Sequence, residues 1–154
     1  MHWKTTALLV AAFILAGSSL LAIAGDAKDA AVKKDRKALQ GTWKTDKDNE
    51  AGITSMRFDG EKCVMTFRGD ITASGTYTID PTQKPRTIDI KVTGVSDKIV
   101  EKYKGKVSLG VYQIDGAKLT WHGNEPGAVS RPKSLTESLT KEEHVLIVFE
   151  KEKK

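Results

Sequence analysis

The sequence contains only one cysteine, Cys63, so no disulfide can form within the chain. Cys63 lies in the apolar run CVMTF, where a buried and unreactive thiol is the expected state. Without a disulfide, the stability of the fold must come from an ordinary hydrophobic core. A chain of 154 residues is long enough to form one.

Histidine is also scarce, and this limits the metal and acid–base chemistry open to the chain. Apart from His2, the sequence has only His122 and His144. Alternation of residues along the predicted strands puts both on outer faces, where we expect neighbouring surface histidines. A structural zinc site needs four protein ligands, so two imidazoles do not predict one.

The usual signatures of catalysis are missing as well. The sequence has no G-x-S-x-G elbow, no phosphate-binding glycine loop, and no obvious pair of acids for glycoside hydrolysis. The formal net charge is +5, but acidic and basic residues are interleaved, so no nucleic-acid-binding surface is indicated. We therefore expect no enzymatic activity, no cofactor and no nucleic-acid partner.

One long apolar run is present, at the N-terminus. Residues 7–24 read ALLVAAFILAGSSLLAIA and follow the basic residue Lys4, while Ala22-Ile23-Ala24 fits a small-x-small cleavage site. This pattern predicts a signal peptide over residues 1–24 and a mature domain over residues 25–154, exported to the periplasm or beyond. An uncleaved membrane anchor is the alternative, because the run approaches the length that a bilayer needs.

The rest of the chain reads as one helix followed by short strands. Residues 27–40 are rich in good helix formers, which predicts a short helix ending at Gly41. The dipeptides Asp59-Gly60 and Asp115-Gly116 are typical of hairpin turns. Runs rich in β-branched and aromatic residues predict eight strands, at 43–47, 53–58, 63–68, 75–80, 87–93, 107–115, 119–122 and 144–149.

Each predicted strand has one apolar face, and no long helix is available to cover a flat sheet. Closing the sheet on itself removes its edges. We therefore predict an all-β fold, an eight-stranded antiparallel up-and-down barrel with the short helix covering one end. The residues expected inside are Met56, Phe58, Cys63, Met65, Phe67, Tyr77, Ile79, Ile88, Ile90, Val92, Tyr112, Ile114, Leu119, Trp121, Val145, Ile147 and Phe149.

The junction of helix and first strand carries the stretch LQGTWK. Gly41 would permit a sharp entry into the strand, and Trp43 would lie across the end of the barrel as a plug. Because the last strand of a closed meander returns beside the first, Lys151 or Lys153 is expected over the indole face.

The GTW entry at residues 41–43 resembles the signature of the lipocalin-like (calycin) barrels. Nearly the whole mature chain resembles an uncharacterised lipocalin-like domain family known mainly from planctomycete bacteria. The matching stretches are DRKALQGTW, FDGEK, GTYTIDPTQKPRTIDI, GVYQIDGAKLTW and the RP at 131–132. The chain departs from the family pattern at Ala117, where an acidic residue is usual, and it lacks the cysteine often found near His122. The resemblance implies the barrel fold and assigns no activity.

The predicted inner face suggests a function in binding. We expect a monomer that holds a small apolar or amphipathic ligand, oriented by a tyrosine or Trp121. The candidate lining is Met56, Phe58, Met65, Phe67, Tyr77, Tyr112 and Trp121. The same residues could form a solid core, in which case the loops at 94–106 and 123–143 would bind an envelope protein, as in inhibitor-like barrels. Contact with a membrane is expected only if the leader stays uncleaved.

Overall fold

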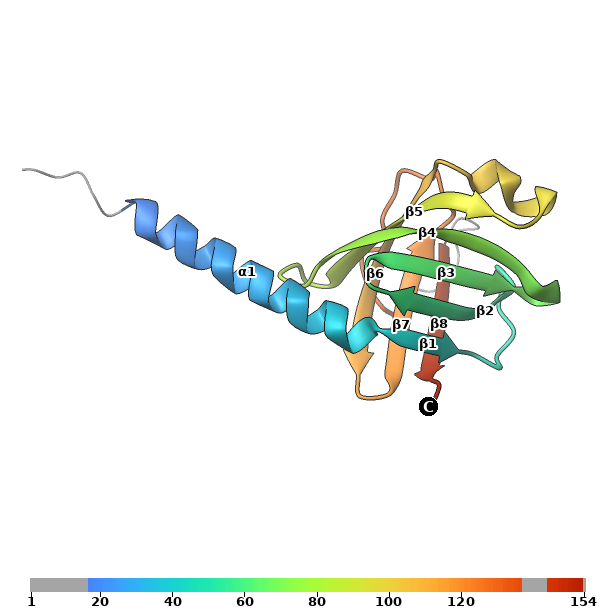
Figure 1. Cartoon of the computed structure of the whole chain (residues 1–154), viewed down its shortest axis with the longest axis horizontal. Helices are drawn as coiled ribbons and strands as arrows, with labels where there is room; N and C mark the ends of the chain where they lie inside the picture. The colour runs from blue at the N-terminus through green and yellow to red at the C-terminus, as the bar shows by residue number, and fades with distance from the viewer. Residues whose placement is uncertain (1–16, 137–143, 154) are drawn as a thin grey trace, which may run out of the picture.

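The structure is a computed structural model that describes residues 17–136 and 144–153. It contains one helix and a closed barrel of eight strands (Figure 1). The elements are α1 (Gly17–Leu39), β1 (Gly41–Lys44), β2 (Ile53–Asp59), β3 (Lys62–Phe67), β4 (Ile71–Asp80), β5 (Arg86–Val95), β6 (Val107–Asp115), β7 (Lys118–Asn124) and β8 (His144–Lys151), with short 3-10 turns η1 (Arg68–Asp70) and η2 (Lys98–Tyr103). Over the described ranges, no helix is both long and apolar enough to cross a membrane.

The predicted antiparallel up-and-down topology is confirmed. Each strand pairs with the next along the chain, and β8 returns to pair with β1, where Trp43 lies opposite Lys151. The turns at Asp59-Gly60 and Asp115-Gly116 join β2 to β3 and β6 to β7, as predicted. Gly60 and Gly116 have φ angles of 60° and 57°, a conformation that glycine adopts without steric cost.

Most strand boundaries differ from the prediction by one or two residues, and two strands differ more. β1 covers Gly41–Lys44 rather than residues 43–47, and β4 begins at Ile71 rather than at Gly75. The β4–β5 register shifts between Ser74 and Gly75, and a Cβ on Gly75 would lie 2.1 Å from the Lys91 carbonyl oxygen. Gly75 therefore lets the strand continue through a bulge, whereas the sequence pattern suggested that it began the strand.

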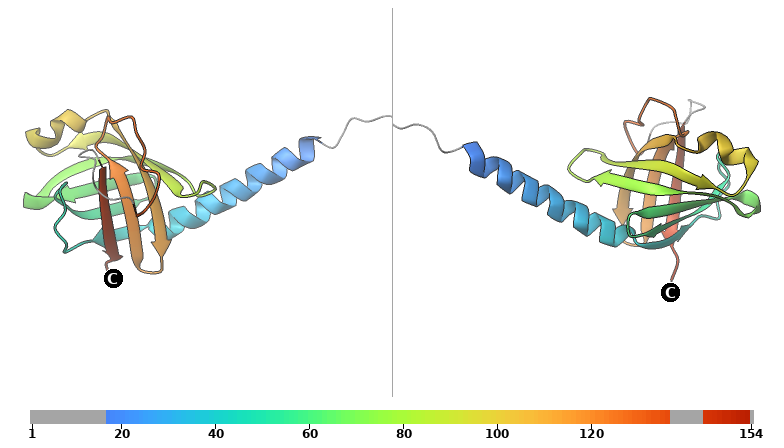
Figure 2. Two further views of the ribbon diagram at one scale, coloured as in Figure 1. Left: turned by 180° about the vertical axis from the view of Figure 1, so that it is seen from behind. Right: turned by 45° about the horizontal axis from the view of Figure 1, so that its top comes forward.

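Helix α1 is longer than the sequence pattern indicated, because it begins at Gly17 instead of near residue 27. Its N-terminal part extends away from the barrel, and its C-terminal end meets the barrel at β1 (Figures 1 and 2). Residues 23–30 are exposed. Residues 17–24 of the predicted leader and the predicted mature helix thus form one continuous helix, of which only the C-terminal part packs on the barrel.

The hydrophobic core has the composition that strand alternation predicted. All the residues expected inside belong to one core cluster or pack against it, apart from Val92, which is buried next to the cavity described below. Phe67, Ile114 and Val145 are only partly buried. The period-2 pattern therefore identified the inner face of every strand from β2 to β8.

Helix α1 meets one end of the barrel, which we call the closed end, and Trp43 fills the interior there. Trp43 is fully buried, and its indole Nε1 donates a hydrogen bond to the Leu39 carbonyl oxygen at 2.7 Å. The Lys151 ammonium lies 5.0 Å from the centre of the indole and donates to the Ala38 carbonyl oxygen at 2.9 Å. Gly41 has a φ of 108°, which favours glycine at this sharp entry.

Candidate functional site

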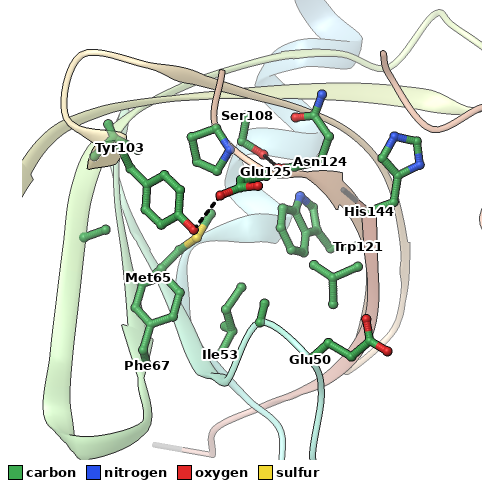
Figure 3. A pocket seen from close by; sticks show the side chains of 15 residues that line it. Glu50, Ile53, Met65, Phe67, Tyr103, Ser108, Trp121, Asn124, Glu125 and His144 are labelled. Carbon is green, nitrogen blue, oxygen red and sulfur yellow. Dashed lines mark hydrogen bonds between the residues drawn. The ribbon is translucent and has the colours of Figure 1, made fainter. Parts of the chain in front are cut away.

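The end of the barrel away from α1 contains a partly open cavity of about 220 Å³ (Figure 3). Every strand except β1 contributes to its lining. The apolar part of the lining is Ala51, Ile53, Met65, Phe67, Ala73, Val92, Trp121, Pro126 and Val145. The two ends of the barrel thus differ, since core side chains such as Trp43 fill the interior at the α1 end, whereas the interior at the other end has space. The hollow of about 560 Å³ at the α1 end, beside Gly41, Arg57 and Lys151, is an open depression lined mainly by polar residues.

The cavity exists partly because two glycines lie side by side on the inner wall. Gly110 of β6 pairs with Gly123 of β7. A Cβ on Gly123 would lie 2.0 Å from Cζ2 of Trp121, and a Cβ on Gly110 would lie 2.9 Å from its Nε1. The indole therefore lies flat against these two backbones, which leaves the middle of the barrel free.

Two neutral polar side chains of the lining, Ser108 and Asn124, bond to the chain itself. The Ser108 hydroxyl donates to the Asn124 carbonyl oxygen at 2.7 Å. The Asn124 amide nitrogen donates to the carbonyl oxygens of Ala128 and Ser130, while its Oδ1 accepts from the Leu109 backbone N–H. These bonds position the wall and the following loop, so these groups are not free to bind a ligand.

An ion pair lies at the mouth of the cavity, beside η2. The Glu125 carboxylate accepts hydrogen bonds from the Lys102 ammonium at 2.9 Å and from the Tyr103 hydroxyl at 3.0 Å. The bond from Lys102 is the main reason that the pKa of Glu125 is lowered, so this carboxylate stays ionised. The contact ties η2 to the segment after β7.

One buried polar atom of the described lining has no partner, and it is the indole nitrogen of Trp121. The residue is 3% exposed, and its Nε1 makes no hydrogen bond. In Figure 3 this nitrogen lies on the edge of the ring that faces Ser108 and Asn124. A buried N–H without an acceptor destabilises the protein, so the group requires a physical explanation.

The structure divides the predicted lining residues between the two ends. Met65, Phe67 and Trp121 border the cavity. Met56, Phe58, Tyr77 and Tyr112 belong to the buried core and do not border it. The cavity residues Ile53, Ala73 and Val92 were not predicted to line it, although Ile53 and Val92 lie in predicted strands and Val92 was expected inside.

The hydroxyls of both buried tyrosines bond near the closed end. The Tyr77 hydroxyl donates to the Gly60 carbonyl oxygen at 2.9 Å and accepts from the Gln40 side chain at 3.2 Å. The Tyr112 hydroxyl donates to Asp35 at 2.7 Å. Burial is the main cause of the raised pKa of each tyrosine. Of the residues expected to orient a ligand, only Trp121 borders the cavity.

Asp35 anchors α1 to the closed end, a role that the sequence pattern did not predict. The residue is 6% exposed, and its Oδ2 accepts from Arg86 at 2.9 Å as well as from Tyr112. Its position in the helical pattern gave no signal, because its partners come from β5 and β6. The carboxylate is compensated by two donors, which is the condition for a stable buried charge.

The two histidines are neighbours, as predicted, but the prediction that they are exposed is wrong. His122 and His144 are neighbours, as expected, with ring centres 5.5 Å apart and an edge-to-face arrangement. They are not on the surface, however, since their exposed fractions are 1% and 8%. His122 Nδ1 lies 2.7 Å from the Ser134 carbonyl oxygen, and His144 Nε2 lies 3.2 Å from that of Ser130. The loop at 125–136 therefore covers the outer faces of the strands here.

The same loop is fixed further along by Arg131. Its guanidinium donates to the Gly110 carbonyl oxygen at 2.7 Å and lies 2.7 Å from the Asp89 carboxylate. The last part of the loop predicted at 123–143 lies outside the described residues. Within the described ranges, no group of three or more histidine, cysteine or acidic side chains could hold a metal ion.

Comparison with known proteins finds no relative of this chain. The chain matches no protein-family model, no curated protein and no solved structure. Membership of the lipocalin-like family therefore stays a prediction. Any function has to be argued from the cavity and the loops themselves.

Proposed function

We propose that the protein is an exported, non-enzymatic binding module that holds one small, mostly apolar ligand in the cavity at the open end. The observation that carries this proposal is the unpartnered indole N–H of Trp121, buried in the wall of a cavity of about 220 Å³. A ligand with one hydrogen-bond acceptor would satisfy the N–H and cover the apolar lining.

The contrast with the closed end supports this proposal. An eight-stranded barrel is just wide enough to be filled by side chains or to hold one small ligand. At the closed end Trp43 has its N–H bonded and is fully buried. At the open end Trp121 lies against Gly110 and Gly123, and the space in front of it is left free. A barrel selected only for stability would gain from filling that space.

The placement of α1 is compatible with export. Among the described residues, the first helix residue that hydrogen-bonds to the barrel is Lys28, whose ammonium donates to the Asp80 carboxylate at 2.8 Å. Cleavage after Ala24, as the sequence predicts, would therefore leave every described helix–barrel hydrogen bond in the mature protein. The intact mass of protein recovered from the cell envelope tests the cleavage, with a chain starting at Gly25 as the expected result.

Native mass spectrometry of the purified protein tests the binding function. We expect an added mass that disappears on denaturation. Ala73 lines the cavity and is 5% exposed, so Ala73→Leu should remove the added mass by occupying the space. Ala30→Leu adds the same atoms on the exposed face of α1 and should leave it unchanged. A bare mass for the unmodified protein would contradict the proposal.

A second function, protein binding through the loops, has one observation in its favour. Ile99 in η2 and Val129 in the loop at 125–136 are 71% and 94% exposed, which is unusual for large apolar side chains. Replacing both with serine should abolish capture of an envelope protein if the loops bind one. Retention of the added mass in that variant would show that the two functions are separate.

A further inference from the structure

We infer that the ligand of this cavity is a compact, uncharged aromatic molecule with a single hydrogen-bond acceptor, such as an aryl ketone or aldehyde. This inference rests on the proposed binding function and specifies the chemical class of its ligand. Four properties of the cavity support it: its volume, the placement of its aromatic side chains, its charge and its one unpartnered donor.

The volume limits the ligand to one or two rings. A cavity of about 150 Å³ holds benzene, and sites for drug-sized ligands are on the order of 300–1,000 Å³. The volume of about 220 Å³ lies between these values. A long acyl chain would have to leave much of its length outside the barrel.

The aromatic side chains favour a flat ligand. In Figure 3 Trp121 lies on one side of the cavity, and Tyr103 and Phe67 lie on the other. The indole is held flat against Gly110 and Gly123, so a broad π-face is available to the ligand. Aromatic rings in offset or edge-to-face contact gain stability beyond that of area burial alone.

The charge of the lining disfavours an anion. Its ionisable members are Glu50, Glu125, Tyr103 and His144, and no lysine or arginine is among the described lining residues. The nearby Lys102 is already bonded to Glu125. A carboxylate entering the cavity would lose its hydration without gaining a cationic partner, which costs free energy.

The indole N–H supplies the specificity. Ser108 and Asn124 are hydrogen-bonded within the chain, whereas Trp121 Nε1 has no partner. A ligand without an acceptor would leave this donor unsatisfied, while a ketone or aldehyde oxygen would accept from it. A single neutral hydrogen bond of this kind corresponds to roughly a three- to tenfold difference in affinity.

A matched set of four probes tests the inference by NMR titration of the backbone amides, which does not depend on tryptophan fluorescence. Acetophenone carries the ring and the acceptor, ethylbenzene has the same shape without the acceptor, benzoate is the anion, and palmitate is the long chain. We expect acetophenone to bind about three- to tenfold more tightly than ethylbenzene. Benzoate and palmitate should bind more weakly than both.

Three variants, one of them a control, show which groups are responsible for the difference in affinity. Trp121→Phe keeps an aromatic ring and removes the donor, so acetophenone should lose its advantage over ethylbenzene. Tyr77→Phe is the matched control, because Tyr77 does not border the cavity and its hydroxyl bonds to Gly60, so the ratio of the two affinities should stay unchanged. Gly123→Ala should weaken all binding, because a Cβ there forces the indole into the cavity.

The outcomes separate the ligand class from the proposed function. Equal affinities for acetophenone and ethylbenzene, or tighter binding of benzoate or palmitate, would overturn the class. If none of the probes binds but native mass spectrometry finds a bound molecule, the class is wrong and the binding function stands. If neither experiment finds binding, both are overturned.

Discussion

The two ends of this barrel belong to one closed sheet, and each has a buried tryptophan, Trp43 of β1 at one end and Trp121 of β7 at the other. At the closed end Trp43 bonds to Leu39, and Asp35 bonds to both Arg86 and Tyr112. At the open end Trp121 has no partner and faces a cavity of about 220 Å³. The difference shows that helix α1 covers one end and bonds to its strands. The other end is left incomplete, which is the arrangement expected of a binding site.

The largest expected effect comes from breaking the closed end at Trp43. Trp43→Ala leaves a large cavity under α1 and should lower the free energy of unfolding by about 3–5 kcal/mol. Urea denaturation measured by circular dichroism gives this value. A loss below about 1 kcal/mol would mean that Trp43 does not plug this end.

The next effect concerns the charge that anchors the helix. Asp35→Ala removes the acceptor for Arg86 and Tyr112 and should cost about 2 kcal/mol, in the range for hydrogen bonds to charged groups. The loss should fall short of that for a fully buried ion pair because the Arg86 side chain is 44% exposed and solvent screens it. Tyr112→Phe removes one of the two bonds and should cost about half as much. Equal stability of Asp35→Ala and the unmodified protein would show that α1 is held by apolar contacts alone.

The free energy of unfolding should also fall at alkaline pH, because the barrel core buries a thiol and two tyrosines. Burial raises the pKa of the Cys63 thiol to about 12, whereas an unfolded cysteine titrates near 8.5. Between these values the unfolded state loses a proton that the folded state keeps, so the free energy of unfolding should fall as pH rises. The slope should approach about 1.4 kcal/mol per pH unit. Tyr77 and Tyr112, whose pKa values are also raised, add to the loss above pH 10.

Cys63→Ala separates the contribution of the thiol from that of the tyrosines. In this variant the fall in stability between about pH 9 and 10 should flatten, while the fall at higher pH remains. Denaturant titrations of both proteins at several pH values measure the two slopes. Identical slopes would contradict the assignment to Cys63.

The smallest effect on stability is expected at the open end. Ala73→Leu places extra atoms in existing space, so it should change the free energy of unfolding by less than about 1 kcal/mol. Urea denaturation of Ala73→Leu and of the control Ala30→Leu measures the difference. A loss above about 2 kcal/mol would indicate that the open end is as tightly packed as the closed end.

Much of the fold could be predicted because its signals are local. Tyr77, Ile79, Tyr112 and Trp121 follow a period of two, and Asp59-Gly60 marks a turn through the conformation of one glycine. The cavity also has a local signal in the sequence, namely two glycines at inward-facing strand positions. Gly110 is in phase with Tyr112, and Gly123 is in phase with Trp121, so both predict gaps on the inner face.

The sequence by itself determined which face of each strand is apolar, because neighbouring residues of a strand must point in opposite directions. Only the tertiary structure decided which polar groups on those strands would find partners. Tyr112 bonds to Asp35 of the helix, and His122 is buried by a loop that closes over the outer wall. These partners come from other segments of the chain, so the periodicity of one strand or helix does not predict them. The physical reason is that hydrogen bonding and burial depend on which segments meet in space, whereas alternation depends only on the geometry of one strand.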